Sequence, residues 1–293
     1  MKLQLAFSSC PNDTFMFDAL VHGRISVSPF EFQLHVADIE ELNRMALDEI
    51  PDITKISYAA YPLLRANYQL LTAGSALGYG SGPLVVSRKK LYPDEIPHVV
   101  MAIPGEHTTA ALLLRALFPG LKPPRTYLFS DIEEAVLSGE VDAGVLIHET
   151  RFTYQKKGLH KVADLGVMWE QTTSLPLPLG AIAVRRTLPE SVKLQLNSHM
   201  RNSVLFAMEN REASRTFVQH YAKAMDREVC EQHIALFVNQ FSIHLGESGR
   251  KAVETLLERV SDIGTHSDIS SGTLPCALSG TCPEAKLPIF VEP

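Results

Sequence analysis

The sequence lacks long runs of one charge and long hydrophobic runs. Asp and Glu outnumber Lys and Arg by 33 to 27 in 293 residues, and the densest basic stretch is only Arg88-Lys89-Lys90. We therefore expect neither a nucleic-acid partner nor a membrane partner. No apolar stretch approaches the roughly 20 residues of a membrane helix. The apolar run after Lys2 is shorter than the core of a secretory signal, about 7–15 residues, which predicts a cytoplasmic protein.

Metal, nucleotide and redox motifs are also missing. The four cysteines (Cys10, Cys230, Cys276 and Cys282) have no Cys-x-x-Cys spacing, so neither a zinc site nor a thioredoxin-like site is expected. Cys276 and Cys282 could pair in an oxidising compartment, although reduced thiols are favoured. No phosphate-binding loop and no dinucleotide glycine fingerprint occur. The sequence thus predicts no metal and no cofactor.

Apolar runs that resemble strands alternate with runs that resemble helices. "KLQLAF" precedes "NDTFMFDALVHG", for which Asp13 is the expected N-cap and Gly23 the stop. Similar pairs continue to about residue 186, which predicts an α/β fold with largely parallel sheets. From about residue 187 the pattern becomes helical. The last 25 or so residues show no period and are expected to form a loosely held tail.

The length and two similar segments predict two lobes. A chain of 293 residues exceeds the size at which one core usually keeps growing. "GPLVVSR" (82–88) and "LGAIAVRR" (179–186) would suit antiparallel crossings between a discontinuous first lobe, 1–85 plus 184–293, and an inserted second lobe, 86–183. Ligands of open α/β sheets bind beyond the carboxyl ends of the strands. A ligand cleft between the lobes is therefore expected.

One segment of the first lobe resembles one of the second. "ADIEELNRMALDEIPDITKISY" and "SDIEEAVLSGEVDAGVLIH" both contain Asp-Ile-Glu-Glu, then a short helix, then an Asp that introduces an apolar strand. These are Asp52 and Asp142. Aligned on them, Tyr58 of the first segment matches His148 of the second. We infer an internal repeat of a helix and a strand, although the lengths differ by three residues and chance is the alternative.

His148 is the strongest candidate for catalysis. It follows the buried-strand pattern Gly144-Val145-Leu146-Ile147 directly, so it should emerge where that strand ends, with Glu149 or a backbone carbonyl available to fix its tautomer. Imidazole titrates near pH 6.5 and suits proton abstraction at neutral pH. A general base typically contributes about 10²–10⁴ in rate. The alternative is a surface or structural histidine.

Three further loops carry polar residues. Thr108 or Thr109 can cap the helix after Pro104-Gly105, and free N–H groups there would favour an anion; an ordinary capped helix is the alternative. Lys55 lies within an apolar strand, where a charge is costly unless it has a partner or reaches solvent. It is either a cation for a carboxylate ligand or an edge-strand lysine that reaches solvent. Ser57 can cap the next helix. The "SSCPNDTF" stretch is expected to form a dense polar turn between strand and helix, in which Cys10 is structural or ligand-lining.

Several of these stretches together resemble one family over nearly the full length. "SSCPNDTFMFDALVHGR", "TKISYAAY", "IPGEHTTA", "GEVDAGVLIHETRFTY" and "SLPLPLGAIAVRR" are similar to the 1,4-dihydroxy-6-naphthoate synthases of the futalosine route to menaquinone. The resemblance implies a two-lobed periplasmic-binding-protein-like fold of type II, with mixed sheets. It also implies a carbon–carbon lyase that converts cyclic dehypoxanthine futalosine, a small carboxylate, without metal or redox cofactor.

The resemblance also implies roles for particular residues. Its proton acceptor falls on His148. Its ligand-contacting blocks fall on Lys55, Ile56, Ser57, Thr108, Thr109 and Ala110, and we add Asn12 as a substrate-binding candidate. Two other functions share this fold, a solute-binding protein of a transporter and the related chorismate dehydratase, and a non-enzymatic sensor module is a third alternative. The missing export signal and the His-Glu end of the strand argue against the first.

Overall fold

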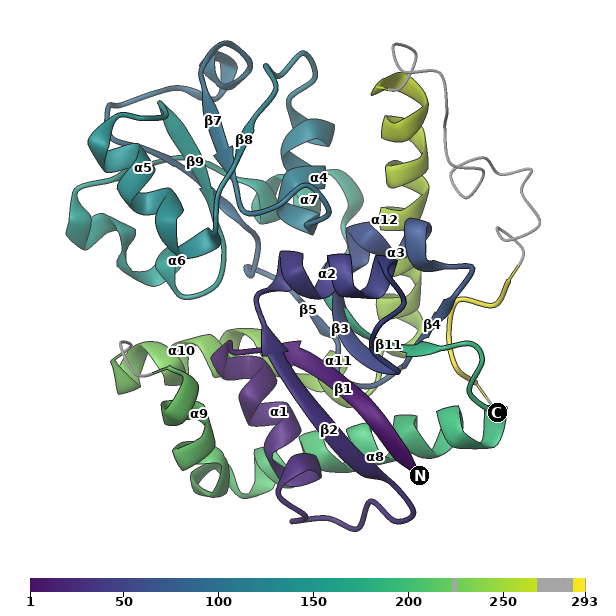
Figure 1. The fold of residues 1–293 in the computed structure, drawn as a ribbon. Coiled ribbons are helices and arrows are strands. Elements are labelled where there is room, and N and C mark those ends of the chain that lie inside the picture. Colours follow the sequence, from purple (N-terminus) through teal and green to yellow (C-terminus); the bar gives the residue numbers. More distant parts are fainter. Residues whose placement is uncertain (223–225, 268–286, 293) are drawn as a thin grey trace. The chain divides into compact units, whose positions relative to one another are not determined.

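A computed structural model describes residues 1–222, 226–267 and 287–292, with the side chains of 260–267 left out. The chain forms two compact units (Figure 1). Unit 1 comprises Met1–Gly78 and Pro178–Pro293, and unit 2 comprises Tyr79–Leu177. The predicted boundaries fell a few residues later, after 85 and after 183. No helix in the described ranges is long and apolar enough to cross a membrane.

Unit 1 contains a mixed sheet. Its strands, in spatial order, are β2 (Glu31–Ala37), β1 (Lys2–Ser8), β3 (Ile53–Ser57), β11 (Leu177–Arg185) and β4 (Tyr68–Leu70), and β5 (Ala76–Gly78) also pairs with β11. Strand β1 is parallel to β2 and β3, whereas β11 is antiparallel to β3 and β4. The sheet is thus mixed rather than largely parallel, because β11 returns to it from unit 2.

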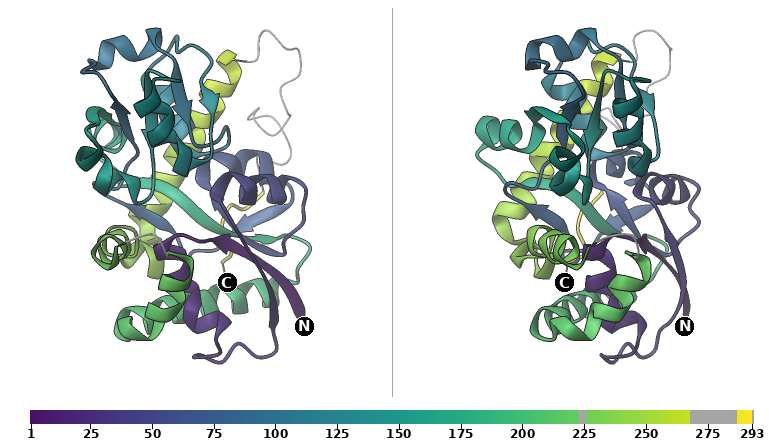
Figure 2. Two further views of the ribbon diagram at one scale, coloured as in Figure 1. Left: turned by 60° about the vertical axis from the view of Figure 1, so that its left-hand side comes forward. Right: turned by 90° about the vertical axis from the view of Figure 1, so that its left-hand side faces the viewer.

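The helices of unit 1 are α1 (Pro11–Val21), α2 (Ile39–Leu47), α3 (Tyr61–Leu64), α8 (Glu190–Glu209), α9 (Arg215–Tyr221), α10 (Arg227–Phe237), α11 (Gln240–Ile243) and α12 (Gly246–Ser267). Helix α1 packs against α8, α9 and α10, and in both views of Figure 2 the purple helix stays among these green ones. This packing buries α1 almost completely, with Phe15, Met16 and Phe17 in the core. Its N-cap position is Cys10, followed by Pro11, so the prediction that Asp13 caps this helix is wrong.

Unit 2 has a second mixed sheet. Its strands, in spatial order, are β10 (His160–Asp164), β6 (Leu84–Ser87), β9 (Ala143–Leu146), β7 (Met101–Ile103) and β8 (Arg125–Thr126). Its helices are α4 (Thr109–Leu117), α5 (Ile132–Ser138), α6 (Thr150–Thr153) and α7 (Leu165–Thr173). Helix α5 approaches β9 closely at Gly144, where an added Cβ would lie 2.5 Å from the Cγ2 atom of Ile132.

The two sheets repeat one topology, which confirms the repeat inferred from the sequence. In unit 2, β7 is parallel to β8 and β9, and β9 is antiparallel to β6. The order β8-β7-β9-β6 therefore matches β2-β1-β3-β11. The Asp52 carboxylate accepts the Gln4 N–H (2.8 Å), and the Asp52 N–H donates to the Gln4 carbonyl (3.0 Å). Asp142 makes the same two bonds with Val100, at 2.9 and 3.0 Å.

The end of the chain does not match the expectation of a loose tail. Residues 287–292 bind the outer edge of β4, where the Leu70 N–H donates to the Ile289 carbonyl and the Val291 N–H to the Leu70 carbonyl, both at 2.8 Å. Phe290 and Val291 are buried. The expectation is therefore wrong for this segment, because an unpaired strand edge offers backbone partners. The rest of the tail, with Cys276 and Cys282, lies outside the described residues; Cys10 and Cys230 are buried free thiols.

Candidate functional site

A buried ion pair occupies the carboxyl end of the sheet in unit 1. The Lys55 Nζ atom on β3 lies 2.9 Å from Asp13 Oδ1, and the two side chains are only 5% and 1% exposed. The same carboxylate accepts the Asn12 Nδ2–H (2.9 Å) and the Ser8 hydroxyl (2.7 Å). Asp13 is thus the centre of a polar cluster that joins β1, α1 and β3. This role of Asp13 is not evident from the sequence, because a carboxylate early in a helix also suggests a cap.

Gly180 makes room for the lysine stem. A Cβ at this position of β11 would lie 2.9 Å from Lys55 Cε and 3.1 Å from the Ile56 carbonyl oxygen. Strand β3 lies between β1 and β11, so Lys55 is a lysine of a central strand, and the alternative that it reaches solvent from an edge strand is wrong. Its charge is already neutralised by Asp13. Contact between Lys55 and a ligand remains a prediction.

Ser57 is held by a side chain that sequence reasoning did not single out. The Asn43 amide of α2 accepts the Ser57 N–H at 2.8 Å and donates to the Ser57 hydroxyl at 3.2 Å. Ser57 makes no side-chain cap to the following turn, so that expectation is wrong. Ile56 is fully buried, backbone included, and contact between Ile56 and a ligand remains a prediction. Asn43 carries no sequence signal beyond its place on the helix of the repeat.

His148 follows β9 in unit 2 and has an unusual backbone. Its φ angle is +57°, one of three positive values among the described non-glycine residues. This region is sparsely populated by residues with a Cβ, and such strain clusters at functional sites. The imidazole is half-buried and packs edge-on against Phe129, with ring centroids 4.9 Å apart. The hydroxyl of Thr150 donates to the Ile147 carbonyl at 2.7 Å and so closes the turn.

The start of α4 lies beside this turn in the topology of unit 2. Thr108 is the N-cap, as predicted: its hydroxyl accepts the Ala111 N–H at 3.2 Å and donates to the Gly105 carbonyl at 2.8 Å. Thr108, Thr109 and Ala110 are each 3% exposed. Strands β7 and β9 are parallel neighbours, so α4 and His148 leave the sheet at the same edge.

The structure therefore groups the predicted residues by unit. In unit 1, Asn12 and Lys55 meet at Asp13, and Ile56 and Ser57 end the same strand β3. The other predicted residues, Thr108 to Ala110 and His148, belong to unit 2, at corresponding places in the repeated topology. No role was predicted for Arg151, which lies on the helical turn α6 directly after His148.

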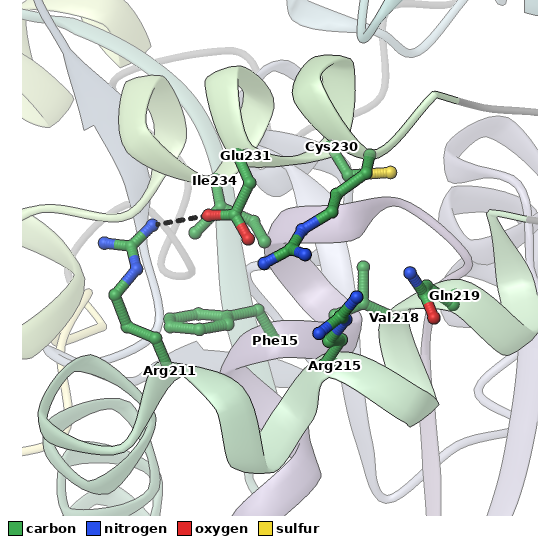
Figure 3. A pocket seen from close by; sticks show the side chains of 9 residues that line it. Phe15, Arg211, Arg215, Val218, Gln219, Cys230, Glu231 and Ile234 are labelled. Atoms are coloured by element: carbon green, nitrogen blue, oxygen red, sulfur yellow. Dashed lines mark hydrogen bonds and ion pairs between the residues drawn. The ribbon is translucent and has the colours of Figure 1, made fainter.

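A separate hollow in unit 1 lies between α1, α9 and α10 (Figure 3). Phe15 lies at its centre, and the Arg211 guanidinium lies over that ring, 5.7 Å from the centroid. Each arginine that lines it already has a carboxylate: Arg211 pairs with Glu231 (3.2 Å), and both Arg215 (3.2 Å) and Arg227 (3.4 Å) pair with Glu212. No predicted site residue lines this hollow. We interpret it as a surface ion-pair network that joins the helices.

Comparison with known proteins identifies the family of the chain. The menaquinone-biosynthesis family matches residues 3–262. A 1,4-dihydroxy-6-naphthoate synthase of Streptomyces coelicolor is 45% identical over 267 residues, covering 89% of this chain and 94% of that protein. The crystal structure of protein AF1704 from Archaeoglobus fulgidus superposes with a TM-score of 0.85 at 36% identity, covering 90% of this chain and 98% of that one.

The fold class is confirmed by a more distant structure. A Candida albicans protein described as having the generic periplasmic-binding-protein fold matches with a TM-score of 0.63 at 10% identity, over 95% of this chain and 93% of that one. Two α/β units with mixed sheets of this kind define the class. Within that class, the chain belongs to the menaquinone-biosynthesis family that includes the 1,4-dihydroxy-6-naphthoate synthases.

Proposed function

We propose that this chain is a 1,4-dihydroxy-6-naphthoate synthase whose general base is His148. The substrate is cyclic dehypoxanthine futalosine, which loses a carbon–carbon bond as its ring becomes aromatic. The observation that carries the assignment of the base is the backbone of His148. His148 has a half-buried imidazole and a φ of +57° directly after a buried strand, and residues held in such sparsely populated backbone regions cluster at functional sites.

Proton abstraction needs a base on one side and a stabilised negative charge on the other. We assign the stabilisation of the negative charge to the first turn of α4. The N–H groups of Thr109 and Ala110 lie at the start of a nine-residue helix, where backbone dipoles favour an anion. Substrate contacts of Lys55, Ile56, Ser57, Thr108 and Asn12 belong to the same proposal, as does a cytoplasmic location.

In unit 1, the role of the Lys55–Asp13 pair is to hold neighbouring residues in place. Because Asp13 neutralises the lysine and also binds Asn12 and Ser8, it fixes the loop after β1 against the end of β3. A ligand that contacts Asn12 and Ser57 would therefore meet a preorganised surface, which spares binding energy otherwise needed to order that surface.

The test is a His148→Asn variant assayed on the cyclic substrate. Loss of a general base predicts a fall in kcat of about 10²–10⁴, with folding checked by circular dichroism. His160→Asn, an exposed histidine of β10 in the same unit, is the matched control and should retain full turnover. If His148→Asn kept kcat within about threefold of the parent, well below that range, the assignment of the base would be wrong.

A further inference from the structure

Arg151 differs from every other arginine of unit 2. All residues of Tyr79–Leu177 are described, and this range contains four arginines. Arg88 donates to the Leu137 carbonyl at 3.3 Å, Arg115 pairs with Glu106, and Arg125 donates to the Glu140 carbonyl at 3.2 Å. The Nη1 atom of Arg151 is shielded from solvent and has no hydrogen-bond partner in the described part of the chain.

The surroundings of Arg151 do not compensate for this burial. Its guanidinium carbon lies 5.9 Å from the centre of the Phe152 ring, a distance at which attraction to the ring is weak. The Asp164 carboxylate supports the positive charge from a distance, but its Oδ1 atom already accepts the N–H groups of Gly166 and Val167, each at 3.1 Å. The pKa of Arg151 is lowered, because burial lowers it more than the Asp164 carboxylate raises it.

A buried cationic N–H group without an acceptor is costly, and a bound anion would remove that cost. The planar guanidinium fork fits a carboxylate in particular, since two N–H groups can meet its two oxygens. Arg151 lies three residues after His148 on the turn that leaves β9. Lys55, the cation that the sequence suggested for a carboxylate, is occupied by Asp13.

We infer that Arg151 binds the carboxylate of the substrate and of the naphthoate product, and so holds the ring against His148. This inference rests on the proposed function, because it takes its ligand from that reaction. Arg151 is a specificity-determining residue in this account. It selects a carboxylate over a neutral group of the same shape, and it takes no part in the proton transfer.

The experiment measures binding rather than turnover. 2-Naphthoate and 2-naphthamide have nearly the same shape, and only the first carries a negative charge. Titration calorimetry should show that the parent binds the carboxylate more tightly. In Arg151→Gln, naphthoate should bind about 10- to 100-fold more weakly, as expected when a charge-assisted hydrogen bond is lost, while naphthamide binding is unchanged. Arg125→Gln, whose arginine has a carbonyl partner, is the control and should leave both affinities intact.

Two results would overturn the inference. One is a parent that binds the acid and the amide equally well, which can be measured without any variant. The other is an Arg151→Gln protein that loses both ligands together, which would indicate a structural role. Arg151→Lys keeps the charge without the fork and should retain part of the preference. These outcomes are separate from a failure of the proposed function, which would appear as a parent without turnover of the cyclic substrate.

Discussion

The buried pair of Lys55 and Asp13 gives a prediction that can be worked through in energy. Asp13→Asn removes the negative charge and places an amide where the carboxylate accepted three side-chain donors. Lys55 then becomes an unpaired cation in a site where only 4% of the residue is exposed. Removing one partner of a buried ion pair costs about 3–5 kcal/mol. We expect a loss of that size in the free energy of unfolding.

The double variant separates the charge from the packing. In Asp13→Asn combined with Lys55→Met, no charge is left unpaired, and replacing a buried pair by neutral groups is often close to neutral. The double variant should therefore be more stable than Asp13→Asn alone, although it carries one substitution more. Contacting residues show interaction energies of about 0.5–3 kcal/mol in such cycles, and this pair should lie at the upper end of that range.

Urea unfolding followed by circular dichroism gives the required free energies, and hydrogen exchange on β3 locates the change in unit 1. Glu231→Gln is the matched control. It neutralises the partner of Arg211 in an ion pair of the same unit whose side chains are about half exposed, so it should cost less than about 1 kcal/mol. The account of the buried pair would be refuted if Asp13→Asn cost no more than this control. It would also be refuted if the losses of stability in Asp13→Asn and in Lys55→Met alone added up to the loss in the double variant.

Two further predictions concern stability. Burial lowers the pKa of His199, so the unfolded chain binds the proton more tightly than the folded chain. The free energy of unfolding should therefore decrease as the pH drops below about 6.5, the pKa of a histidine in the unfolded chain. In urea titrations, His199→Gln should weaken this pH dependence, whereas substitution of the exposed His160 by Gln should not. If the free energy of unfolding changed with pH equally in both variants, the prediction would be refuted. Ending the chain after residue 286 removes the buried Phe290 and Val291, so the melting temperature should fall, consistent with about 1.5–3 kcal/mol per side chain; unchanged melting would contradict this.

The sequence predicted those parts of the fold that depend on local pattern. The Asp-Ile-Glu-Glu segments marked both copies of the repeat, because the aspartates that introduce β3 and β9 bind the backbone of the neighbouring strand in the same way. The cap at Thr108 could be predicted for a similar reason, since an N-cap is a local interaction. His148 could be singled out because an apolar strand ended in a titratable group.

Contacts between distant segments could not be predicted in this way. Asp13 and Lys55 are 42 positions apart, and Asn43 reaches Ser57 across a helix–strand unit, so no spacing rule connects them. The docking of Ile289 on Leu70 spans most of the chain and depends on a free strand edge that no period reveals. The lack of a partner for the Nη1 atom of Arg151 is likewise visible only when all its neighbours are in place.

The repeat also shows why only one of the two corresponding strand ends carries a candidate base. Aligned on Asp52 and Asp142, Tyr58 of unit 1 occupies the place of His148 in unit 2. Tyr58 is fully buried, its hydroxyl lies 2.7 Å from the Ser75 hydroxyl, and burial raises its pKa, so it holds its proton at neutral pH. His148 is half-buried and carries an imidazole, the side chain that most often serves as a general base. The same strand end therefore carries a structural phenol in one copy and a candidate base in the other.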